Sequence, residues 1–312
     1  MEPYISVVIP VYNEEESIEA LYKELKSVLD NIKKTYEIIF VDDGSTDKSF
    51  EILEKLHNKD KKVKVIKFRR NFGQTSAISA GFDNSKGDII ITMDADLQND
   101  PKDIPKLLDE IKKGYDVVSG WRKNRKDPFI TKKVPSKISN ILARKLTGVN
   151  INDFGCTLKA YRRKAIENIE LYGEMHRYVP ALVSWRGFRI GEIPVIHHER
   201  RYGKTKYNVF RLMKGFLDLI NIKFWTRYST RPLHFFGAFG ILMVLLGSII
   251  SIYLALTKIF LNESIGERPL LILGVLFVIV GVQFITFGFL YEILTKIYYS
   301  NRKIYEVEKI LK

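Results

Sequence analysis

Two aspartates one residue apart, Asp94 and Asp96, are the first side chains in this sequence of 312 residues that could bind a metal ion. They follow residues 89–92, an apolar and β-branched run that predicts a short buried strand. In an extended backbone alternate side chains point the same way, so both carboxylates can face one point at the strand's carboxyl end. Mg²⁺ and Mn²⁺ usually take one or two carboxylates together with substrate phosphates. With the nearby amide oxygen of Gln98, the pattern predicts such a site; a solvated acidic turn is the alternative.

The elements around this pair alternate between strands and helices. Strands are predicted at residues 5–9, 37–41, 64–68 and 116–119, and helices at residues 18–29, 73–84 and 101–113. This order predicts right-handed crossovers and a mainly parallel sheet of the α/β class, with ligands at the carboxyl ends of the strands. Asn13, Glu14, Asp42 and Asp43 fall at those ends, and Ser45 or Thr46 is expected to cap the next helix. The sequence has no Gly-x-Gly-x-x-Gly, so a metal would have to hold phosphates.

The composition limits the class of partner and the compartment. The net charge of +14 suits nucleic acid, anionic lipid headgroups or anionic substrates, and does not choose among them. Cys156 is the only cysteine, so an intramolecular disulfide is impossible and a reducing compartment is expected. The first ten residues have the pattern of a strand rather than of a signal peptide.

The C-terminal third has the pattern of a membrane anchor. Residues 233–256 and 270–291 are apolar and almost without charge, and each exceeds the ~20 residues needed to cross a hydrocarbon core. A buried helical hairpin in a soluble domain is the disfavoured alternative. Residues 207–226 predict a basic amphipathic helix lying in the membrane interface. Basic residues flank the two spans outside their connecting loop, which predicts that the main domain and both termini are cytoplasmic at the plasma membrane.

The segments between the aspartates and the spans are less regular. Residues 122–133 are a basic, proline-containing loop, and residues 136–146 predict an amphipathic helix. Residues 153–163 predict a turn and a strand, residues 179–185 a helix, and residues 189–196 a further strand. His176, His197 and His198 do not have metal-ligand spacing with the cysteine, so a zinc site is not expected.

Six motifs occur in a fixed order along the chain. They are PVYNE (10–14), DDGSTD (42–47), RNFGQTSAISAG (70–81), DADLQ (94–98), DFGCTLKAYRR (153–163) and RYGKTKY (201–207). With the two spans, this order resembles glycosyltransferase family 2, and within it the polyprenyl-phosphate glycosyltransferases of the dolichol-phosphate-mannose-synthase-like group. Within that group it resembles bacterial-type undecaprenyl-phosphate glucosyltransferases, which have two C-terminal spans. The resemblance covers essentially the whole chain.

The resemblance implies a GT-A fold and a metal-dependent, inverting transfer of one sugar from a nucleotide diphosphate sugar to a lipid monophosphate. The residues that it implies for nucleotide-sugar binding are Pro10, Tyr12, Glu14, Asp42, Asp43, Asn71 and Gln74. Asp94, Asp96 and Gln98 would hold Mg²⁺ or Mn²⁺ against the diphosphate. UDP-glucose is the first expected donor, ahead of UDP-N-acetylhexosamines and GDP-mannose, and the acceptor would be undecaprenyl or dolichyl phosphate.

The same resemblance implies Arg122, Lys132 and Ser136 at the acceptor phosphate. Lys132 stands where the family usually has arginine, and a lysine cannot form the bidentate fork. Arg201 and Lys206 are candidates for further catalytic cations. A phosphate monoester is already largely ionised at pH 7, so a strong general base is unnecessary, and Asp153 is expected to orient the donor sugar.

The implied organisation has four parts. Residues 1–204 would form the cytoplasmic GT-A domain, 205–231 the interface helix region, 232–296 the two transmembrane helices and 297–312 a cytoplasmic tail. A homo-oligomer is expected, because a lone hairpin offers little protein–protein burial.

Three other classes of function fit the sequence less well. A processive polysaccharide synthase shares the fold, but normally carries Gln-x-x-Arg-Trp and more spans; here Trp121-Arg122 and Trp185-Arg186 run in the opposite order. A non-catalytic membrane scaffold with a nucleotide-sugar fold is opposed by the intact DADLQ motif. A nucleic-acid binder is rejected, because no recognised motif is present and strand-end aspartates would repel phosphate without a metal.

Overall fold

The chain forms two compact units, Met1–Ile222 and Lys223–Lys312. The computed structural model describes residues 2–123, 134–199, 223–224, 232–261, 264–266 and 268–299, and for 134–138 and 298–299 it describes the backbone. The predicted interface helix therefore lies almost entirely outside the described residues. The four-part division stays a prediction.

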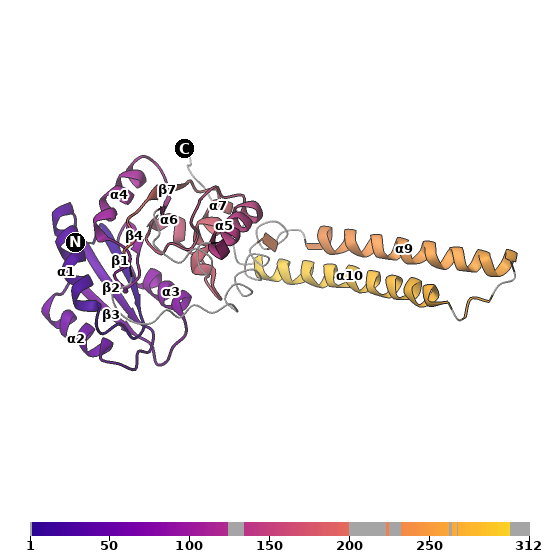
Figure 1. Cartoon of the computed structure of the whole chain (residues 1–312), viewed down its shortest axis with the longest axis horizontal. Coiled ribbons are helices and arrows are strands. Elements are labelled where there is room, and N and C mark those ends of the chain that lie inside the picture. The colour runs from indigo at the N-terminus through magenta and orange to yellow at the C-terminus, as the bar shows by residue number, and fades with distance from the viewer. Residues whose placement is uncertain are drawn as a thin grey trace. The chain divides into compact units, whose positions relative to one another are not determined.

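The first unit is built on a mixed sheet, most of which is parallel (Figure 1). Its strands are β1 (Ile5–Val11), β2 (Tyr36–Asp42), β3 (Val63–Lys67), β4 (Ile89–Thr92), β5 (Val117–Trp121), β6 (Lys159–Arg162) and β7 (Ile190–Pro194). In the described part of the chain they lie in the order β3-β2-β1-β4-β6-β5-β7. The strand β6 runs antiparallel to both of its neighbours, and the other pairs are parallel. The predicted mainly parallel sheet is confirmed.

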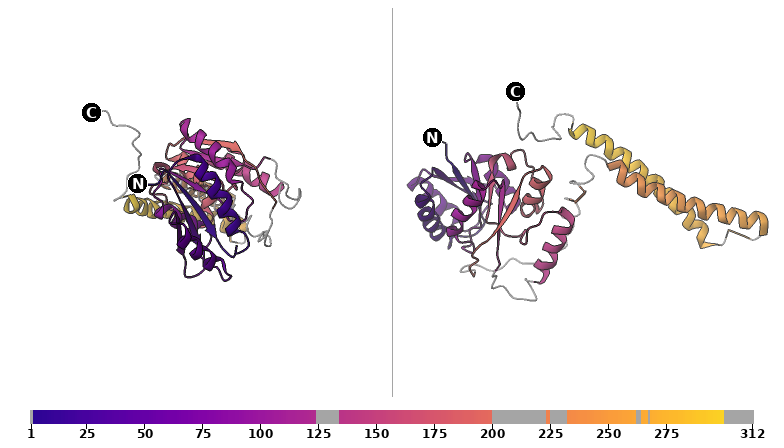
Figure 2. Two further views of the ribbon diagram at one scale, coloured as in Figure 1. Left: turned by 90° about the vertical axis from the view of Figure 1, so that its left-hand side faces the viewer. Right: turned by 90° about the horizontal axis from the view of Figure 1, so that it is seen from above.

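Helices cover both faces of this sheet (Figure 2). They are α1 (Ile18–Ile32), α2 (Ser49–Lys59), α3 (Gln74–Asn84), η1 (Pro101–Asp103), α4 (Ile104–Lys112), α5 (Val134–Thr147), α6 (Arg163–Ile166), η3 (Met175–Arg177) and α7 (Val179–Trp185). Apolar residues of α1, α2 and α4 belong to one buried cluster, and those of α3 and α6 and most of those of α7 belong to a second. A third cluster includes residues of α5, η3 and α7.

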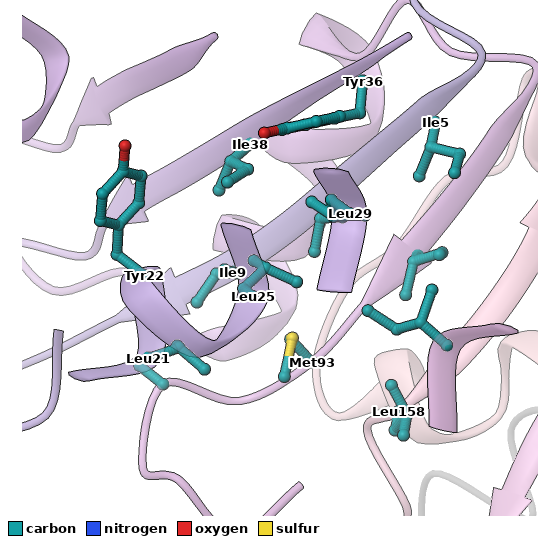
Figure 3. Packing of buried hydrophobic residues seen from close by; sticks show 14 of the residues in the cluster. Ile5, Ile9, Leu21, Tyr22, Leu25, Leu29, Tyr36, Ile38, Met93 and Leu158 are labelled. Atoms are coloured by element: carbon teal, nitrogen blue, oxygen red, sulfur yellow. The ribbon is translucent and has the colours of Figure 1, made fainter. Parts of the chain in front are cut away.

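The alternation of side chains along the central strand explains this sandwich. Ile5 and Ile9 of β1 point into the cluster under α1, where Leu21 and Leu25 are fully buried (Figure 3). Val8, between them in sequence, points to the opposite cluster under α3. Both faces of β1 are thus buried, as expected for a central parallel strand. Each such side chain contributes about 1.5–3 kcal/mol when fully buried.

The expected cap of α2 is wrong. The helix begins at Ser49, four and three residues after Ser45 and Thr46, and its cap residue has no side-chain hydrogen bond. The backbone N–H of Ser49 instead donates to Asp47 Oδ1 at 2.9 Å. Ser45 and Thr46 are used to hold the neighbouring loop, as described below.

The second unit contains two long apolar helices, α9 (Pro232–Leu261) and α10 (Pro269–Tyr299), which include both predicted spans. Both are long and apolar enough to cross a membrane, and most of their large side chains are exposed. They pack against each other through glycines: a Cβ added to Gly240 would lie 2.6 Å from the carbonyl oxygen of Gly281, and one added to Gly247 would lie 2.6 Å from that of Gly274. A hairpin that is apolar on its outside indicates membrane association.

Candidate active site at the carboxyl ends of the strands

Asp94 lies just beyond β4, at the carboxyl edge of the sheet, and both of its carboxylate oxygens accept hydrogen bonds. Gln74 Nε2 donates to Oδ1 at 2.8 Å, and the hydroxyl of Thr157 donates to Oδ2 at 2.7 Å. The pKa of Asp94 is raised to about 6, mainly by burial and in addition by the negative charge of Asp96. Two carboxylates are therefore held close together in a poorly solvated place.

The loop after Asp94 turns sharply and brings the next candidates back to the same place. Leu97 has a φ of 61°, in the left-handed region. Asp96 is buried, and its Oδ1 accepts the backbone N–H of Gln98 at 3.1 Å. The side-chain amide of Gln98 donates to the carbonyl of His198 at 3.4 Å, which leaves its own oxygen as an acceptor.

These residues fit a divalent cation. A carboxylate oxygen can accept more than one hydrogen bond or also bind a cation, so the bonds from Gln74 and Thr157 do not block Asp94. A cation would relieve the repulsion from Asp96 that helps to raise the pKa of Asp94. Among the described residues, no three His, Cys, Asp or Glu side chains come together as a complete ligand set. Two carboxylates and an amide oxygen match the incomplete protein shell typical of a metal that also binds substrate phosphates.

Asp43 joins the loop after β2 to the loop before α3. Its Oδ1 accepts the backbone N–H of Phe72 at 2.7 Å, and its Oδ2 accepts that of Gly73 at 2.9 Å. Burial raises the pKa of Asp43, and the two backbone hydrogen bonds oppose this rise. Both oxygens of this predicted nucleotide-binding residue are thus used to hold the backbone.

Asp42 is different from its neighbour. It is fully buried, and its Oδ1 accepts the backbone N–H of Ser45 at 3.1 Å. Its Oδ2 is buried without a hydrogen-bond partner among the described residues. An unpaired buried carboxylate oxygen is costly, so it suits a position that a ligand hydroxyl or N–H completes.

Two further loops interlock beside these aspartates. Asn13 has a φ of 55°, and its side-chain oxygen accepts the backbone N–H of Thr46 at 2.8 Å. The backbone N–H of Asn13 donates to the Ser45 hydroxyl at 3.0 Å. Gly44 has a φ of +70°, and a Cβ added there would lie 2.4 Å from the carbonyl carbon of Arg70. The first three motifs of the sequence therefore form one connected loop cluster.

The remaining predicted nucleotide residues lie on these same loops. Pro10 and Tyr12, at the end of β1, are half-buried, and Asn71 is exposed. The backbone N–H of Glu14 donates to the Ser49 hydroxyl at 2.9 Å. Gln74, placed with the nucleotide by resemblance, is bonded to Asp94 and so connects the nucleotide loops to the proposed metal ligands.

A bidentate ion pair joins Arg122, which directly follows β5, to Asp153 in the loop before β6. The guanidinium donates from Nε to Oδ2 at 2.7 Å and from Nη2 to Oδ1 at 2.9 Å. Burial lowers the pKa of Arg122, but the charge of Asp153 and its hydrogen bonds outweigh this and hold that pKa above its usual range. Glu192 of β7 fixes the same loop, since its Oε1 accepts the backbone N–H of Asp153 at 3.0 Å.

Sequence reasoning missed three residues of this site. Thr157 bonds Asp94, Lys159 is buried behind the same loop, and Glu192 holds Asp153 from β7. Thr157 and Lys159 lie within DFGCTLKAYRR, so the motif was found but its inner residues were not given roles. A charged lysine in an otherwise apolar strand pattern is the signal that could have identified Lys159.

Several predicted residues fall outside this description. Lys132, Arg201 and Lys206 lie outside the described residues; Ser136 lies in α5, and its side chain is not described. His198, near the end of the described range 134–199, lies beside the DADLQ loop, because its backbone N–H donates to the carbonyl of Gln98 at 2.9 Å.

Comparison with known proteins agrees with this geometry. Residues 6–170 match the family described as Glycosyl transferase family 2. The chain belongs to glycosyltransferase family 2. The family resemblance expected from the six motifs is thereby confirmed, and the protein is a glycosyltransferase.

Two curated relatives extend over nearly the whole chain. A dodecaprenyl-phosphate galacturonate synthase of Rhizobium johnstonii is 42% identical over 95% of this chain and 89% of its own length. An undecaprenyl-phosphate 4-deoxy-4-formamido-L-arabinose transferase of Edwardsiella ictaluri is 39% identical over 96% of this chain and 91% of its own length. Both matches extend past the catalytic domain into the two apolar helices.

A solved structure supports the fold. Glucosyl-3-phosphoglycerate synthase from Mycobacterium tuberculosis, in complex with Mn²⁺, UDP and phosphoglyceric acid, aligns with a TM-score of 0.56 and 18% identity. The alignment covers 72% of this chain and 78% of that one. The expected GT-A fold of the first unit is confirmed.

Proposed function

We propose that the protein transfers one sugar, with inversion, from a nucleotide diphosphate sugar to a polyprenyl phosphate. Both curated relatives are named as transferring a sugar to a polyprenyl phosphate, and they match more than nine tenths of this chain. The observation that carries the proposal is the position of Asp94 and Asp96. They lie at the carboxyl edge of the sheet, beside the loops of Asp42 and the buried Arg122–Asp153 pair.

The loop cluster of the first three motifs would bind the nucleotide. Asp42 offers a buried carboxylate oxygen to a ligand donor, and Asp43 holds the loop of Phe72 and Gly73 in place. Pro10, Tyr12, Glu14 and Asn71 would complete this subsite from the same loops. Gln74 would hold Asp94 at the boundary between nucleotide and diphosphate.

Asp94, Asp96 and Gln98 would hold Mg²⁺ or Mn²⁺. Such an ion stabilises the negative charge that develops on a diphosphate leaving group. In the transfer, an oxygen of the acceptor phosphate forms a bond with the anomeric carbon while the bond to the diphosphate oxygen breaks. The acceptor enters as an anion, so the protein residues have to position it rather than deprotonate it.

Arg122, Lys132 and Ser136 would bind the acceptor phosphate, and Arg201 and Lys206 would add positive charge near the leaving group. In the part of the chain that the structure describes, Arg122 uses two of its five N–H groups, both on Asp153, and the other three could bind an anion. Asp153, the partner of Arg122 in the ion pair, would orient the donor sugar.

The apolar hairpin of α9 and α10 would anchor the protein in the membrane that contains the lipid acceptor. We propose that the catalytic domain and both termini lie on the cytoplasmic side of the plasma membrane. Basic residues flank the spans at the ends away from their connecting loop, and such residues are enriched on the cytoplasmic side. Association into a homo-oligomer is part of the same proposal, since the outer faces of both helices are apolar.

Transfer of labelled sugar into an organic-extractable lipid tests the proposal. Purified protein, undecaprenyl phosphate and Mg²⁺ or Mn²⁺ would be incubated with UDP-glucose, a UDP-N-acetylhexosamine, GDP-mannose, UDP-galacturonate and a UDP-linked 4-deoxy-4-formamido-L-arabinose. UDP-glucose is our first donor, and the last two follow the names of the relatives. One EDTA-sensitive lipid product would support the proposal and identify the sugar. Donor binding without any product would instead favour the non-catalytic scaffold.

A further inference from the structure

A lysine is completely buried behind the proposed active site, and no role has been given to it so far. Lys159 is the first residue of β6 and its exposed fraction is 2%. Lysine is almost never fully buried unless its charge is compensated, because removal of an ammonium from water is costly. Burial lowers the pKa of Lys159 to about 8, so the side chain remains mostly protonated at neutral pH.

The ammonium of Lys159 binds the backbone of the preceding loop. It donates to the carbonyl of Phe154 at 3.2 Å and to the carbonyl of Cys156. These two carbonyls lie on either side of Gly155, so one cation fixes the turn between Asp153 and Thr157. The negative charges of Asp153 and Asp94 raise the pKa of Lys159, against the effect of burial, so this cation also partly compensates the site electrostatically.

The loop fixed in this way makes the contacts on which the site depends. At its start, Asp153 pairs with Arg122. At its end, Thr157 donates its hydroxyl to Asp94 Oδ2 at 2.7 Å and accepts Asn99 Nδ2 at 3.0 Å. The Thr157 carbonyl accepts the hydroxyl of Thr92 at 2.7 Å, which ties the loop to the end of β4.

We infer that Lys159 is a positioning residue for sugar transfer: it holds the 153–157 loop so that Thr157 orients Asp94 and Asp153 faces Arg122. It acts from beneath the site and does not touch the substrates. The inference rests on the proposed function, because it assigns Lys159 to the metal and acceptor sides of that same site.

Arg163, which directly follows the same strand, provides a matched control. Its guanidinium also binds two backbone carbonyls, those of Ser85 at 3.1 Å and of Gly87, but at the opposite edge of the sheet. Lys159→Met and Arg163→Met therefore both remove a cation that bridges carbonyls, and only the first does so behind the site.

The test compares Lys159→Met, Arg163→Met, Thr157→Val and the double variant of Lys159 and Thr157. Mn²⁺ binding would be measured by calorimetry and transfer by the lipid assay, after circular dichroism has shown that each protein is folded. We expect Lys159→Met to lower kcat and weaken Mn²⁺ binding by about tenfold or more each, with Arg163→Met within about twofold of the wild type. If Lys159 acts through Thr157, the double variant should bind Mn²⁺ no more weakly than Lys159→Met does.

The remaining outcomes distinguish a failure of this inference from a failure of the proposed function. An inactive wild-type protein would contradict the proposed function, whereas the Mn²⁺ titrations would still test the role of Lys159. Equal effects of Lys159→Met and Arg163→Met on Mn²⁺ binding in an active protein would overturn the inference alone. Additive losses of Mn²⁺ affinity in the double variant would also overturn it, because Lys159 and Thr157 would then act independently. If Lys159→Met and Lys159→Gln fail to fold while Arg163→Met folds, Lys159 is required for folding and the inference is likewise overturned.

Discussion

Arg122 and Asp153 neutralise each other in a buried bidentate ion pair, with side-chain exposures of 14% and 5%. One of them was expected at the acceptor phosphate and the other at the donor sugar, so the pair connects the two halves of the proposed reaction. Loss of one partner of a buried pair is costly, because the other charge remains uncompensated. A variant at either position therefore changes both subsites.

Replacement of Asp153 by asparagine is expected to retain more activity than replacement of Asp96 by asparagine. The amide in Asp153→Asn would keep one acceptor oxygen for Arg122 and could still orient a sugar, whereas loss of the Asp96 charge would weaken metal binding directly. We expect about a 10- to 100-fold loss of kcat/KM for Asp153→Asn and a greater loss for Asp96→Asn. Steady-state kinetics in the lipid assay measures both, with thermal unfolding as the control for stability. Equal losses would argue that Asp153 has a more direct part in the reaction.

The pH dependence of metal binding should report Asp94. Its pKa of about 6 in the folded protein lies above its ordinary value of 3.8, first because of burial and then because of Asp96. A metal must displace the proton, so Mn²⁺ affinity should fall about tenfold per pH unit below pH 6 and level off above pH 7. Thr157→Val removes a hydrogen bond that lowers this pKa, so the midpoint should move to higher pH. Affinity independent of pH between 5 and 7.5 would contradict the assignment of Asp94.

The raised pKa of Asp94 should also make the stability of the metal-free protein depend on pH. Between pH 4 and pH 6, roughly, the folded state keeps a proton on Asp94 that the unfolded state releases. The contribution of Asp94 to the free energy of unfolding therefore falls as the pH rises through this window. Saturating Mn²⁺ should abolish this trend, because Asp94 is then deprotonated in the folded state as it is in the unfolded state above about pH 5. Thermal melts at pH 5 and pH 7, with and without the metal, would show it. Asp94→Asn should remove both effects.

The sequence was sufficient to predict the fold because its local patterns agree with one another. Continuous apolar runs such as residues 89–92 became strands buried on both faces, and the two apolar spans became long helices. The direction of β6 was not predictable in this way. It depends on how the chain returns after α5, and a four-residue strand has the same apolar pattern in either direction.

The candidate site was only partly predictable from the sequence. Asp94 and Asp96 were found because their type and spacing match the needs of a metal ion. The roles of Asp43, Thr157 and Lys159 depend on backbone groups brought together from distant parts of the chain, and no local pattern encodes such contacts. Interior hydrogen bonding of this kind becomes visible when the backbone path is known.

Gly44→Ala should destabilise the nucleotide loops. A side chain at a φ of +70° is strained, and here its Cβ would also meet the carbonyl carbon of Arg70 at 2.4 Å. Gly148→Ala is the matched control, since Gly148 has a φ of +77° and open space around its Cβ position. We expect the free energy of unfolding to fall by about 1–2 kcal/mol in Gly148→Ala and by at least about 1 kcal/mol more in Gly44→Ala. Donor affinity should fall in Gly44→Ala alone; equal denaturation midpoints and affinities would show that the loops adapt.

The membrane hairpin should depend on the close approach of its two helices at glycine. The Cβ of Gly240→Ala would lie 2.6 Å from the carbonyl oxygen of Gly281, in a contact between backbones that cannot be relieved by rotation of a side chain. Gly237→Ala, one turn earlier on α9, would meet only the Leu233 side chain at 3.6 Å, an ordinary packing distance. We expect Gly240→Ala to cost about 1–3 kcal/mol through overpacking, and Gly237→Ala to be neutral or slightly stabilising because alanine favours a helix. Thermal unfolding in detergent, followed by helical circular dichroism, compares the two. Equal midpoints would show that α9 and α10 are not packed through these glycines in the membrane-mimetic state, since a Cβ at Gly240 cannot be accommodated at the present separation.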